Sequence, residues 1–190
     1  MSNKRKHISN IRHLTSDIRR RAPIVPDLLQ SELRLVFCGT APSRISAREK
    51  AYYANPGNQF WHALHRVRLT PRLFHPQEYP KLLSLGIGLT DLCKTCSGND
   101  DELPPEALER EALKKKIRRY KPKLVAFTSK NAASIYFGHK VEYGLQNETL
   151  NDTQFYVLCS TSGRARRFWK EEVWRELADI IRLDKTAKLR

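Results

Sequence analysis

The sequence predicts an α/β protein whose mostly parallel sheet is covered by helices on both faces. Two observations lead to this fold class. Short apolar runs rich in β-branched and aromatic residues alternate with segments whose apolar residues recur every three to four positions. Each run stops at turn residues, and the chain between runs is long enough for the crossover that parallel strands require. The predicted strands cover residues 33–38, 86–92, 124–128 and 155–159.

Helices are predicted between and after these strands. Asn58 is a good N-cap, and Phe60, Trp61 and Leu64 give the helix that follows it an apolar face. The other helices are expected at 79–85, from 106 to 120, from the loop and N-cap at 129–131 to Phe137, and over 173–181. The turn-rich stretch 55–58 and the acidic, proline-containing stretch 97–105 are expected to be loops.

The chain of 190 residues has the length of one domain with short extensions. We expect a basic N-terminal arm at residues 1–26, a folded domain at 27–184 and a basic C-terminal tail at 185–190. Ile8, Ile11, Leu14 and Ile18 recur at helical spacing in the arm. The arm either grips phosphate through an amphipathic helix or is a solvated extension packed loosely on the domain.

The charge balance is strongly basic, with 35 Lys and Arg against 20 Asp and Glu and a formal net charge of +15. An excess of this size on a small domain is typical of a protein that binds a polyanion, because phosphate neutralisation releases counterions. The alternative is a solvated basic surface. Charge alone therefore favours a nucleic acid as the partner.

The four cysteines are too few and too scattered for a disulfide framework. Cys93 and Cys96 form a lone C-x-x-C without a second pair, so no metal site is predicted, and we expect two buried and two loop thiols. No apolar segment approaches the length of a membrane span, and the basic N-terminus lacks the apolar stretch of a signal peptide. These features predict a soluble, intracellular protein.

Polar loops follow three of the predicted strands, after Cys38, around Asp91 and after Cys159. The carboxyl ends of parallel strands meet at one edge of a sheet, where ligands of open α/β proteins bind. We therefore expect the functional site at this edge.

Four segments in register carry a family resemblance: Phe-Cys-Gly-Thr-Ala-Pro-Ser at 37–43, Tyr-Ala-Asn-Pro-Gly-Asn-Gln-Phe-Trp at 53–61, Gly-Ile-Gly-Leu-Thr-Asp-Leu at 86–92 and Ser-Thr-Ser-Gly at 160–163. They resemble the mismatch-specific uracil-DNA glycosylases, the branch that includes the thymine-DNA glycosylases. The resemblance implies a three-layer α/β/α sandwich that flips a base from the duplex and hydrolyses its N-glycosidic bond. It also implies that neither a metal nor another cofactor takes part.

Two positions depart from that branch. Ala41 stands where the family has an asparagine that holds the attacking water, and Ser160 stands where its second motif begins with asparagine. Tyr52, Tyr53 and Ser160 to Ser162 look more like the related deoxyinosine (hypoxanthine) glycosylase branch. The residue that holds the water is therefore expected in another loop.

The resemblance assigns base binding to the first two segments. Tyr53 matches the aromatic residue that stacks on the flipped base, although a tyrosine that anchors the loop in the core is the alternative. Backbone N–H groups of Thr40 and Ala41 would donate to a carbonyl oxygen of the base. Asn55 is a further base-binding candidate, and it is also one of the residues that could hold the water.

Asp91 and Asn58 are the predicted catalytic residues. A carboxylate at the end of a buried strand can orient water and favour an oxocarbenium-like sugar, but Asp91 could equally accept backbone N–H groups. Asn58 could reach the sugar, or could serve only as an N-cap.

The segment after the last strand matches the family's intercalation loop. Arg164 is expected to enter the space left by the flipped nucleotide and to contact the orphaned base, with Ser162 and Gly163 shaping the loop. Phosphate binding alone is the alternative reading of Arg164. Ser43 and Lys130 are expected near the DNA backbone.

The sequence thus predicts a monomeric, monofunctional DNA glycosylase that acts on duplex DNA inside the cell and prefers uracil. Hypoxanthine is the rival substrate. A protein that binds lesions or abasic sites with little catalysis is an alternative of a different class, favoured by Ala41 and Ser160.

Overall fold

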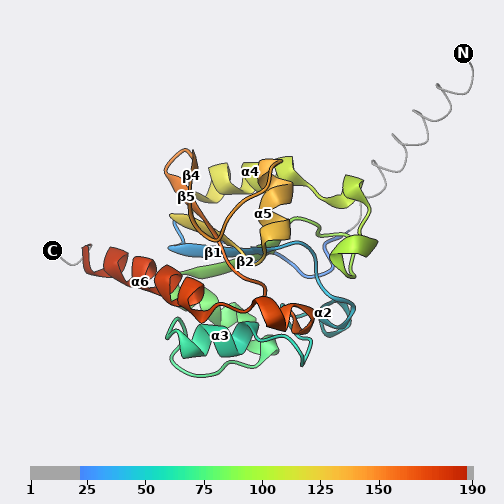
Figure 1. Ribbon diagram of the computed structural model, residues 1–190, viewed down its shortest axis with the longest axis horizontal. Helices are drawn as coiled ribbons and strands as arrows, with labels where there is room; N and C mark the ends of the chain where they lie inside the picture. Colours follow the sequence, from blue (N-terminus) through green and yellow to red (C-terminus); the bar gives the residue numbers. More distant parts are fainter. Residues whose placement is uncertain (1–21, 188–190) are drawn as a thin grey trace, which may run out of the picture.

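The computed structural model describes residues 22–187, and the sheet in it has five strands in the order β2-β1-β3-β5-β4 (Figure 1). Four strands run parallel, and β4 at the edge pairs antiparallel with β5. The strands are β1 (Leu35–Gly39), β2 (Ile87–Asp91), β3 (Leu124–Phe127), β4 (Gly144–Leu150) and β5 (Thr153–Val157). This mostly parallel α/β architecture confirms the predicted fold class.

Helices cover both faces of the sheet, as parallel strands require. In Figure 1, α4 and α5 lie above the sheet and α3 and α6 lie below it. The α-helices are α2 (Arg44–Glu49), α3 (Phe60–Arg66), α4 (Arg110–Tyr120), α5 (Lys130–Phe137) and α6 (Glu171–Ala187). The 3₁₀-helices are η1 (Pro76–Leu85), η2 (Asp100–Glu102), η3 (Pro105–Ala107) and η4 (Gly163–Phe168).

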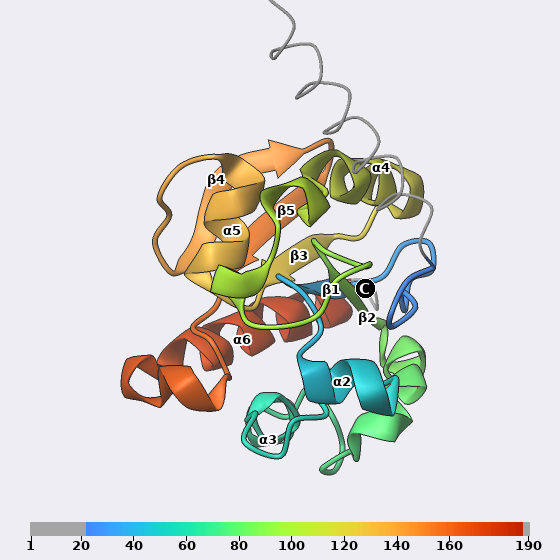
Figure 2. The same ribbon diagram turned by 90° about the vertical axis from the view of Figure 1, so that its right-hand side faces the viewer.

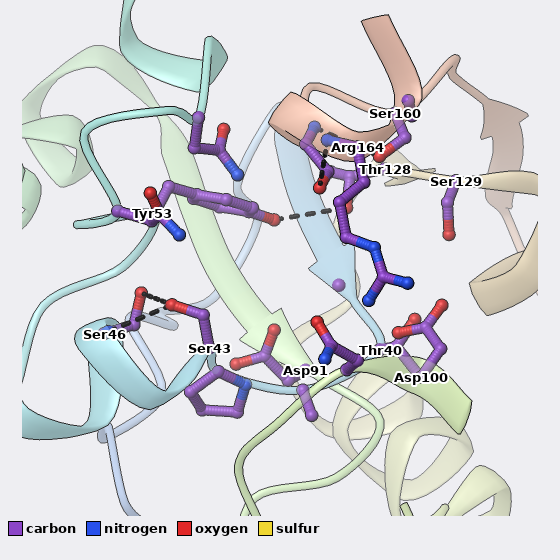
Figure 3. A pocket seen from close by; sticks show the side chains of 18 of the residues that line it. Thr40, Ser43, Ser46, Tyr53, Asp91, Asp100, Thr128, Ser129, Ser160 and Arg164 are labelled. Carbon is purple, nitrogen blue, oxygen red and sulfur yellow. Dashed lines mark hydrogen bonds between the residues drawn. The ribbon is translucent and has the colours of Figure 1, made fainter. Parts of the chain in front are cut away.

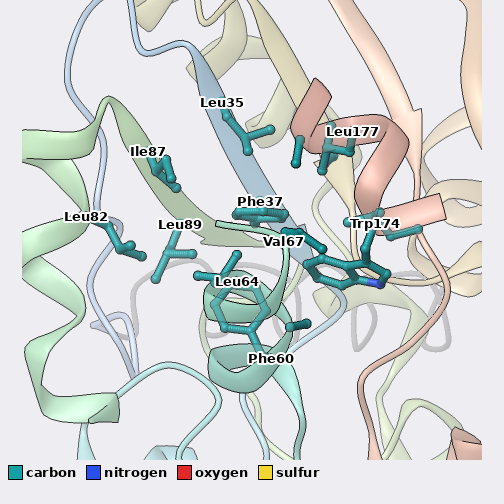
Figure 4. Packing of buried hydrophobic residues seen from close by; sticks show 14 of the residues in the cluster. Leu35, Phe37, Phe60, Leu64, Val67, Leu82, Ile87, Leu89, Trp174 and Leu177 are labelled. Carbon is teal, nitrogen blue, oxygen red and sulfur yellow. The ribbon is translucent and has the colours of Figure 1, made fainter. Parts of the chain in front are cut away.

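Strand β1 supplies side chains to two apolar clusters because successive residues of a strand point to opposite faces. Leu35 and Phe37 pack with α3, η1 and α6, where Trp174 is fully buried (Figure 4). Val36 and Cys38 pack with α4 and α5 on the other face. Burial on both faces explains why these strands read as continuous apolar runs.

The predicted strands 33–38, 86–92, 124–128 and 155–159 correspond to β1, β2, β3 and β5. Strand β4 and helix α2 were not predicted. The helix expected from residue 106 begins at Arg110, after the short η3, and the helix expected at 79–85 is the 3₁₀-helix η1. Helix α3 begins at Phe60 with Gln59 in the N-cap position, one residue later than expected from Asn58.

The apolar spacing predicted for the N-terminal arm lies outside the described residues. Packing on the core begins within the segment assigned to that arm, since Val25 is fully buried and the N–H of Ile24 donates to the Lys94 carbonyl at 2.8 Å. In the described part of the chain, none of the helices is both long enough and apolar enough to cross a membrane.

The strand order places a switch point between β1 and β3. The chain leaves β1 for β2 on one side and then crosses to β3 on the other. Crevices at such points, beyond the carboxyl ends of the strands, are the usual ligand sites of open α/β sheets. Figure 2 looks toward this edge, with α5 above the strand ends and α2 below them.

Candidate active site

A cavity of about 710 Å³ lies at the carboxyl ends of β1, β2 and β3. Ligand pockets have volumes of roughly 300 to 1,000 Å³, so the cavity is large enough for a nucleobase with part of its sugar. Asp91 lines it together with parts of segments 39–46, 52–58, 98–101, 128–131 and 160–168. The predicted polar loops after β1, β2 and β5 therefore meet here.

Asp91 is the buried carboxylate of the cavity, with only 4% of its surface exposed. Within residues 22–187, its Oδ2 atom has no hydrogen-bond partner. The nearest cation is the Lys94 ammonium, with Nζ 3.7 Å from Oδ2. Burial raises the pKa of Asp91 to about 6, and Asp27 adds to this effect while Lys94 and Lys116 oppose it. Burial therefore makes the Asp91 carboxylate a stronger proton acceptor than an exposed aspartate.

Tyr53 forms one side of the cavity (Figure 3). Its hydroxyl donates to Thr128 Oγ1 at 3.3 Å, and its ring stacks on Phe60 with centroids 3.8 Å apart. Burial and the adjacent Asp91 raise the pKa of Tyr53 well above the usual value. The Tyr53 side chain is therefore neutral. Thr128 fixes its hydroxyl, and Phe60 packs against one face of its ring.

Ser46 holds the turn that presents Tyr53. Its Oγ accepts hydrogen bonds from the Ala54 N–H and from the Ser43 hydroxyl, both at 3.1 Å. Ser43 Oγ in turn accepts from the Ser46 N–H and caps α2. Tyr53 itself has a φ of 52°, a left-handed conformation that an L-residue adopts only when its surroundings enforce it. The short α2 therefore fixes the loop between β1 and α3.

Asn55 and Asn58 both line the cavity, but their side-chain oxygens serve their own turn. Asn55 Oδ1 accepts from the Gly57 N–H, and Asn58 Oδ1 accepts from the Phe60 N–H, each at 2.9 Å. The role of Asn58 at the start of α3 is thus present in the structure. These amide oxygens already accept a hydrogen bond, whereas Asp91 Oδ2 has no partner among the described residues and is available to accept one from a water molecule.

The segment after β1 offers backbone donors to the cavity. The Thr40 carbonyl accepts from the Cys93 N–H at 2.8 Å, which fixes the turn. In the described part of the chain, no backbone carbonyl accepts a hydrogen bond from the N–H of Thr40 or Ala41. This geometry is compatible with the predicted contact of these groups with a base carbonyl.

The loop after β5 contacts the turn before α3. The Gln59 N–H donates to the Thr161 carbonyl at 2.9 Å, and a Cβ on Gly163 would lie 3.1 Å from the Gly57 oxygen. Ser162 Oγ accepts from the Arg164 N–H at 3.4 Å. The exposed Arg164 side chain extends past this loop toward the side of the cavity where Thr40 and Asp100 lie (Figure 3).

Lys130 lies apart from the residues that line the cavity. Its Nζ pairs with Glu142 Oε2 at 2.5 Å and lies 4.4 Å from the centre of the Tyr143 ring. Lys170 approaches the same ring at 5.8 Å. The predicted contact of Lys130 with the DNA backbone would therefore occur outside the cavity.

The cysteines do not form a centre of their own. Cys38, Cys93 and Cys159 are buried and Cys96 is half-buried, so one of the two expected loop thiols lies in the interior. All four are free thiols. Among residues 22–187, no group of three or more His, Cys, Asp and Glu side chains is placed to hold a metal ion.

Among the residues in or next to the cavity that sequence reasoning missed, Ser46, Thr128, Lys94 and Phe168 bear on the argument. Ser46 is one of many polar residues in the sequence, and Thr128 is the last residue of the predicted strand 124–128. Lys94 stands inside the C-x-x-C of Cys93 and Cys96, and its spacing of three from Asp91 is only a weak signal. Phe168 lines the cavity and is 53% exposed, which is unusual for a phenylalanine.

Comparison with known proteins agrees with this geometry. The family described as the uracil DNA glycosylase superfamily matches residues 26–178. The chain belongs to this superfamily. Membership supports a DNA glycosylase activity in general, with DNA as the substrate.

A solved structure supports the same assignment. It is a solution NMR structure from Methanosarcina acetivorans described as a "putative Uracil DNA glycosylase". The two chains are 25% identical with a TM-score of 0.55, over 83% of this chain and 96% of the other. The resemblance predicted from the four segments is confirmed at the level of the superfamily, whereas the branch stays a prediction.

Proposed function

We propose that this protein is a monofunctional DNA glycosylase that flips a deaminated base, uracil before others, into the cavity and hydrolyses its N-glycosidic bond. The observation that carries the proposal is the juxtaposition of Asp91 and Tyr53 in one cavity of nucleobase size. Arg164 lines the same cavity, and the basic segment 164–167 to which it belongs matches a negatively charged partner.

Tyr53 is proposed to stack on the flipped base. Phe60 covers one face of its ring, which leaves the other face for a ligand. Stacking of a base on an aromatic ring contributes about 1–3 kcal/mol. The N–H groups of Thr40 and Ala41 are proposed to donate to a carbonyl oxygen of the base, where negative charge accumulates as the bond breaks.

Asp91 is proposed to accept a hydrogen bond from the attacking water. The water oxygen bonds to C1′ as the C1′–N bond breaks, and the departing base takes the electron pair. The proton of the water passes to the carboxylate, whose negative charge also stabilises the cationic sugar. This role replaces the asparagine that the family places where this chain has Ala41. Asn58 stays a second candidate through its amide.

Arg164 is proposed to enter the duplex where the flipped nucleotide leaves it and to contact the orphaned base, supported by Ser162 and Gly163. Its exposure at the cavity suits this role. An Arg164→Ala variant should lose activity on duplex DNA more than on single strands. Equal losses on both substrates would restrict Arg164 to phosphate binding.

The test uses single-turnover excision from duplexes that contain one uracil or one hypoxanthine, with alkali cleavage of the abasic product. Uracil should be removed faster. Asp91→Asn should lower the rate at least a hundredfold, whereas Asp152→Asn, an exposed matched control, should leave it unchanged. Similar rates for Asp91→Asn and the unmodified protein would contradict the role of Asp91.

Two alternatives have distinct outcomes in the same assay. Faster removal of hypoxanthine would assign the protein to the branch that Tyr52 and Ser160 resemble. Tight binding to an abasic duplex without excision of either base would indicate a lesion-binding protein with little catalysis.

A further inference from the structure

We propose that Lys94 is a positioning residue that keeps the Asp91 carboxylate ionised and fixed toward the cavity, and that Asp27, a second carboxylate on the same ammonium, limits how strongly Lys94 acts on Asp91. The inference rests on the proposed role of Asp91. Neither Lys94 nor Asp27 lines the cavity, so both would act through Asp91 rather than on the substrate.

Lys94 is buried to an extent that is rare for a lysine, with 6% of its surface exposed. Its ammonium donates to the Tyr52 hydroxyl at 2.7 Å and lies 3.1 Å from Asp27 Oδ1. It also lies 3.7 Å from Asp91 Oδ2. A buried ammonium is costly unless it is paired, so two carboxylates and a hydroxyl fix it at one point.

Asp27 is the junction of this network. Its Oδ2 lies 2.6 Å from the Lys116 ammonium, and its Oδ1 accepts a hydrogen bond from Thr90 Oγ1 at 2.7 Å. The pKa of Asp27 is lowered because Lys94 and Lys116 outweigh the effect of burial. Asp27 is therefore ionised, and it retains Lys116 as a partner when Lys94 is replaced.

Asp91 differs from Asp27 in having one distant cation and an orphaned oxygen. Its Oδ2 lacks a hydrogen-bond partner among the described residues, and Lys94 is the only residue with an ion pair to it there. An opposite charge within about 4–6 Å typically lowers the pKa of a carboxyl by one unit or more. The titratable groups that face Asp91 from the surrounding elements are Cys38, Tyr52, Tyr53, Asp27, Lys94 and Lys116.

The network predicts opposite shifts for two substitutions. Lys94→Met removes the positive charge beside Asp91, so the acid limb of the excision rate should move to higher pH by about one unit. Asp27→Asn removes a negative charge and leaves Lys94 to act on Asp91 alone, so the limb should move to lower pH. A merely structural role would slow excision without moving the limb in opposite directions.

The experiment measures single-turnover excision from a uracil duplex between pH 5 and pH 9. Lys115→Met and Asp152→Asn are matched controls, since both residues are exposed, and neither should move the limb. Folding is checked by circular dichroism and thermal unfolding. If Lys94→Met does not fold, the position of the acid limb in Asp27→Asn tests the proposal by itself. A limb that stays in place in Asp27→Asn, or shifts of the same sign in both variants, would overturn the proposal.

A second measurement does not depend on activity. The carboxyl ¹³C resonance of Asp91, identified as the signal absent from Asp91→Asn, is titrated in the free protein. Opposite displacements of its midpoint in the two variants would support the control of Asp91 by Lys94. The same displacements with an excision rate that is independent of Asp91 would refute the proposed function and leave the charge coupling intact.

Discussion

The Asp91 carboxylate occupies the space that a side chain on Gly39 would need. A Cβ on Gly39 would lie 2.5 Å from Asp91 Oδ1 and 3.3 Å from the Tyr53 hydroxyl. The two residues are register partners at the ends of β1 and β2. The absence of a side chain at Gly39 therefore sets where the buried carboxylate can sit relative to the tyrosine.

A Gly39→Ala variant should fold but excise poorly. The new methyl group meets the end of the Asp91 side chain rather than backbone, so we expect the carboxylate to be displaced while the free energy of unfolding changes little. We expect at least a tenfold loss of single-turnover rate with a small change in melting temperature. Gly144→Ala should lower the melting temperature and leave the excision rate unchanged. Gly144 has a φ of 100°, which strains an alanine, and no neighbour lies within 4 Å of the added Cβ. Unchanged excision in Gly39→Ala would argue against a fixed carboxylate.

Asp91→Asn should stabilise the protein near neutral pH. The pKa of Asp91 rises from an ordinary 3.8 to about 6 on folding, so the folded state favours the protonated acid. The associated stability is full below pH 4 and is lost as the pH rises through 6, by about 3 kcal/mol at about 1.4 kcal/mol per pH unit. The asparagine avoids this loss. Urea unfolding at pH 4 and pH 7 should show a gain for Asp91→Asn at pH 7 only.

Asp27→Asn should have the reverse effect on stability. The pKa of Asp27 is lowered on folding, so its contribution is present above the ordinary value and is lost as the pH falls. The variant should be less stable than the unmodified protein at pH 7, and the difference should shrink toward pH 3. Urea titrations of the two aspartate variants side by side would reveal this opposition. Parallel pH dependences would contradict it.

Ser46→Ala should loosen the turn that carries Tyr53. The substitution leaves the Ala54 N–H and the Ser43 hydroxyl without their acceptor, at a cost of about 1–3 kcal/mol. Chemical denaturation should show this loss, together with slower excision. Ser84→Ala removes an exposed hydroxyl that donates to the Lys81 carbonyl and should cost less than about 0.5 kcal/mol. Equal losses in the two variants would exclude a special role for Ser46.

Phe168→Ala should weaken DNA binding without lowering stability. The ring is 53% exposed beside the cavity, with the Arg167 guanidinium 4.7 Å from its centre. Loss of one aromatic contact with a base corresponds to a loss of about fivefold or more in affinity. Leu145→Ala, at a residue that is 48% exposed on the edge strand, is the control. Binding to an abasic duplex, followed by fluorescence anisotropy, distinguishes the two.

The central strands were predictable because both faces of them are buried. Val36 and Phe37 point to opposite sides and both lie in apolar clusters, so the run is apolar without interruption. Strand β4 has no such signal, since most of Gly144–Leu150 is exposed at the edge of the sheet. Helix α2 was missed for a related reason, because Ser46 is the only residue of Arg44–Glu49 that is buried.

The candidate site was predictable where chemistry follows a strand end. Asp91 was identified from its place at a strand end, and Tyr53 and Thr40 were identified from the family resemblance; the structure brings all three to one cavity. Lys94 was not predicted because its burial depends on the ion pair with Asp27, which lies 67 positions earlier in the chain. Contacts of this range leave no local pattern, and a lysine near a loop normally reads as solvated surface.

The contact between the turn before α3 and the loop after β5 also bears on how this domain could be re-engineered. The Gln59 N–H donates to the Thr161 carbonyl, and a Cβ on Gly163 would crowd the Gly57 oxygen, although the two segments are about a hundred residues apart. Residues in contact do not respond independently to substitution. A chimaera that takes only one of these loops from another member of the superfamily should therefore pack poorly where the two loops meet. Only the joint transfer of both loops should carry a relative's substrate preference into this scaffold.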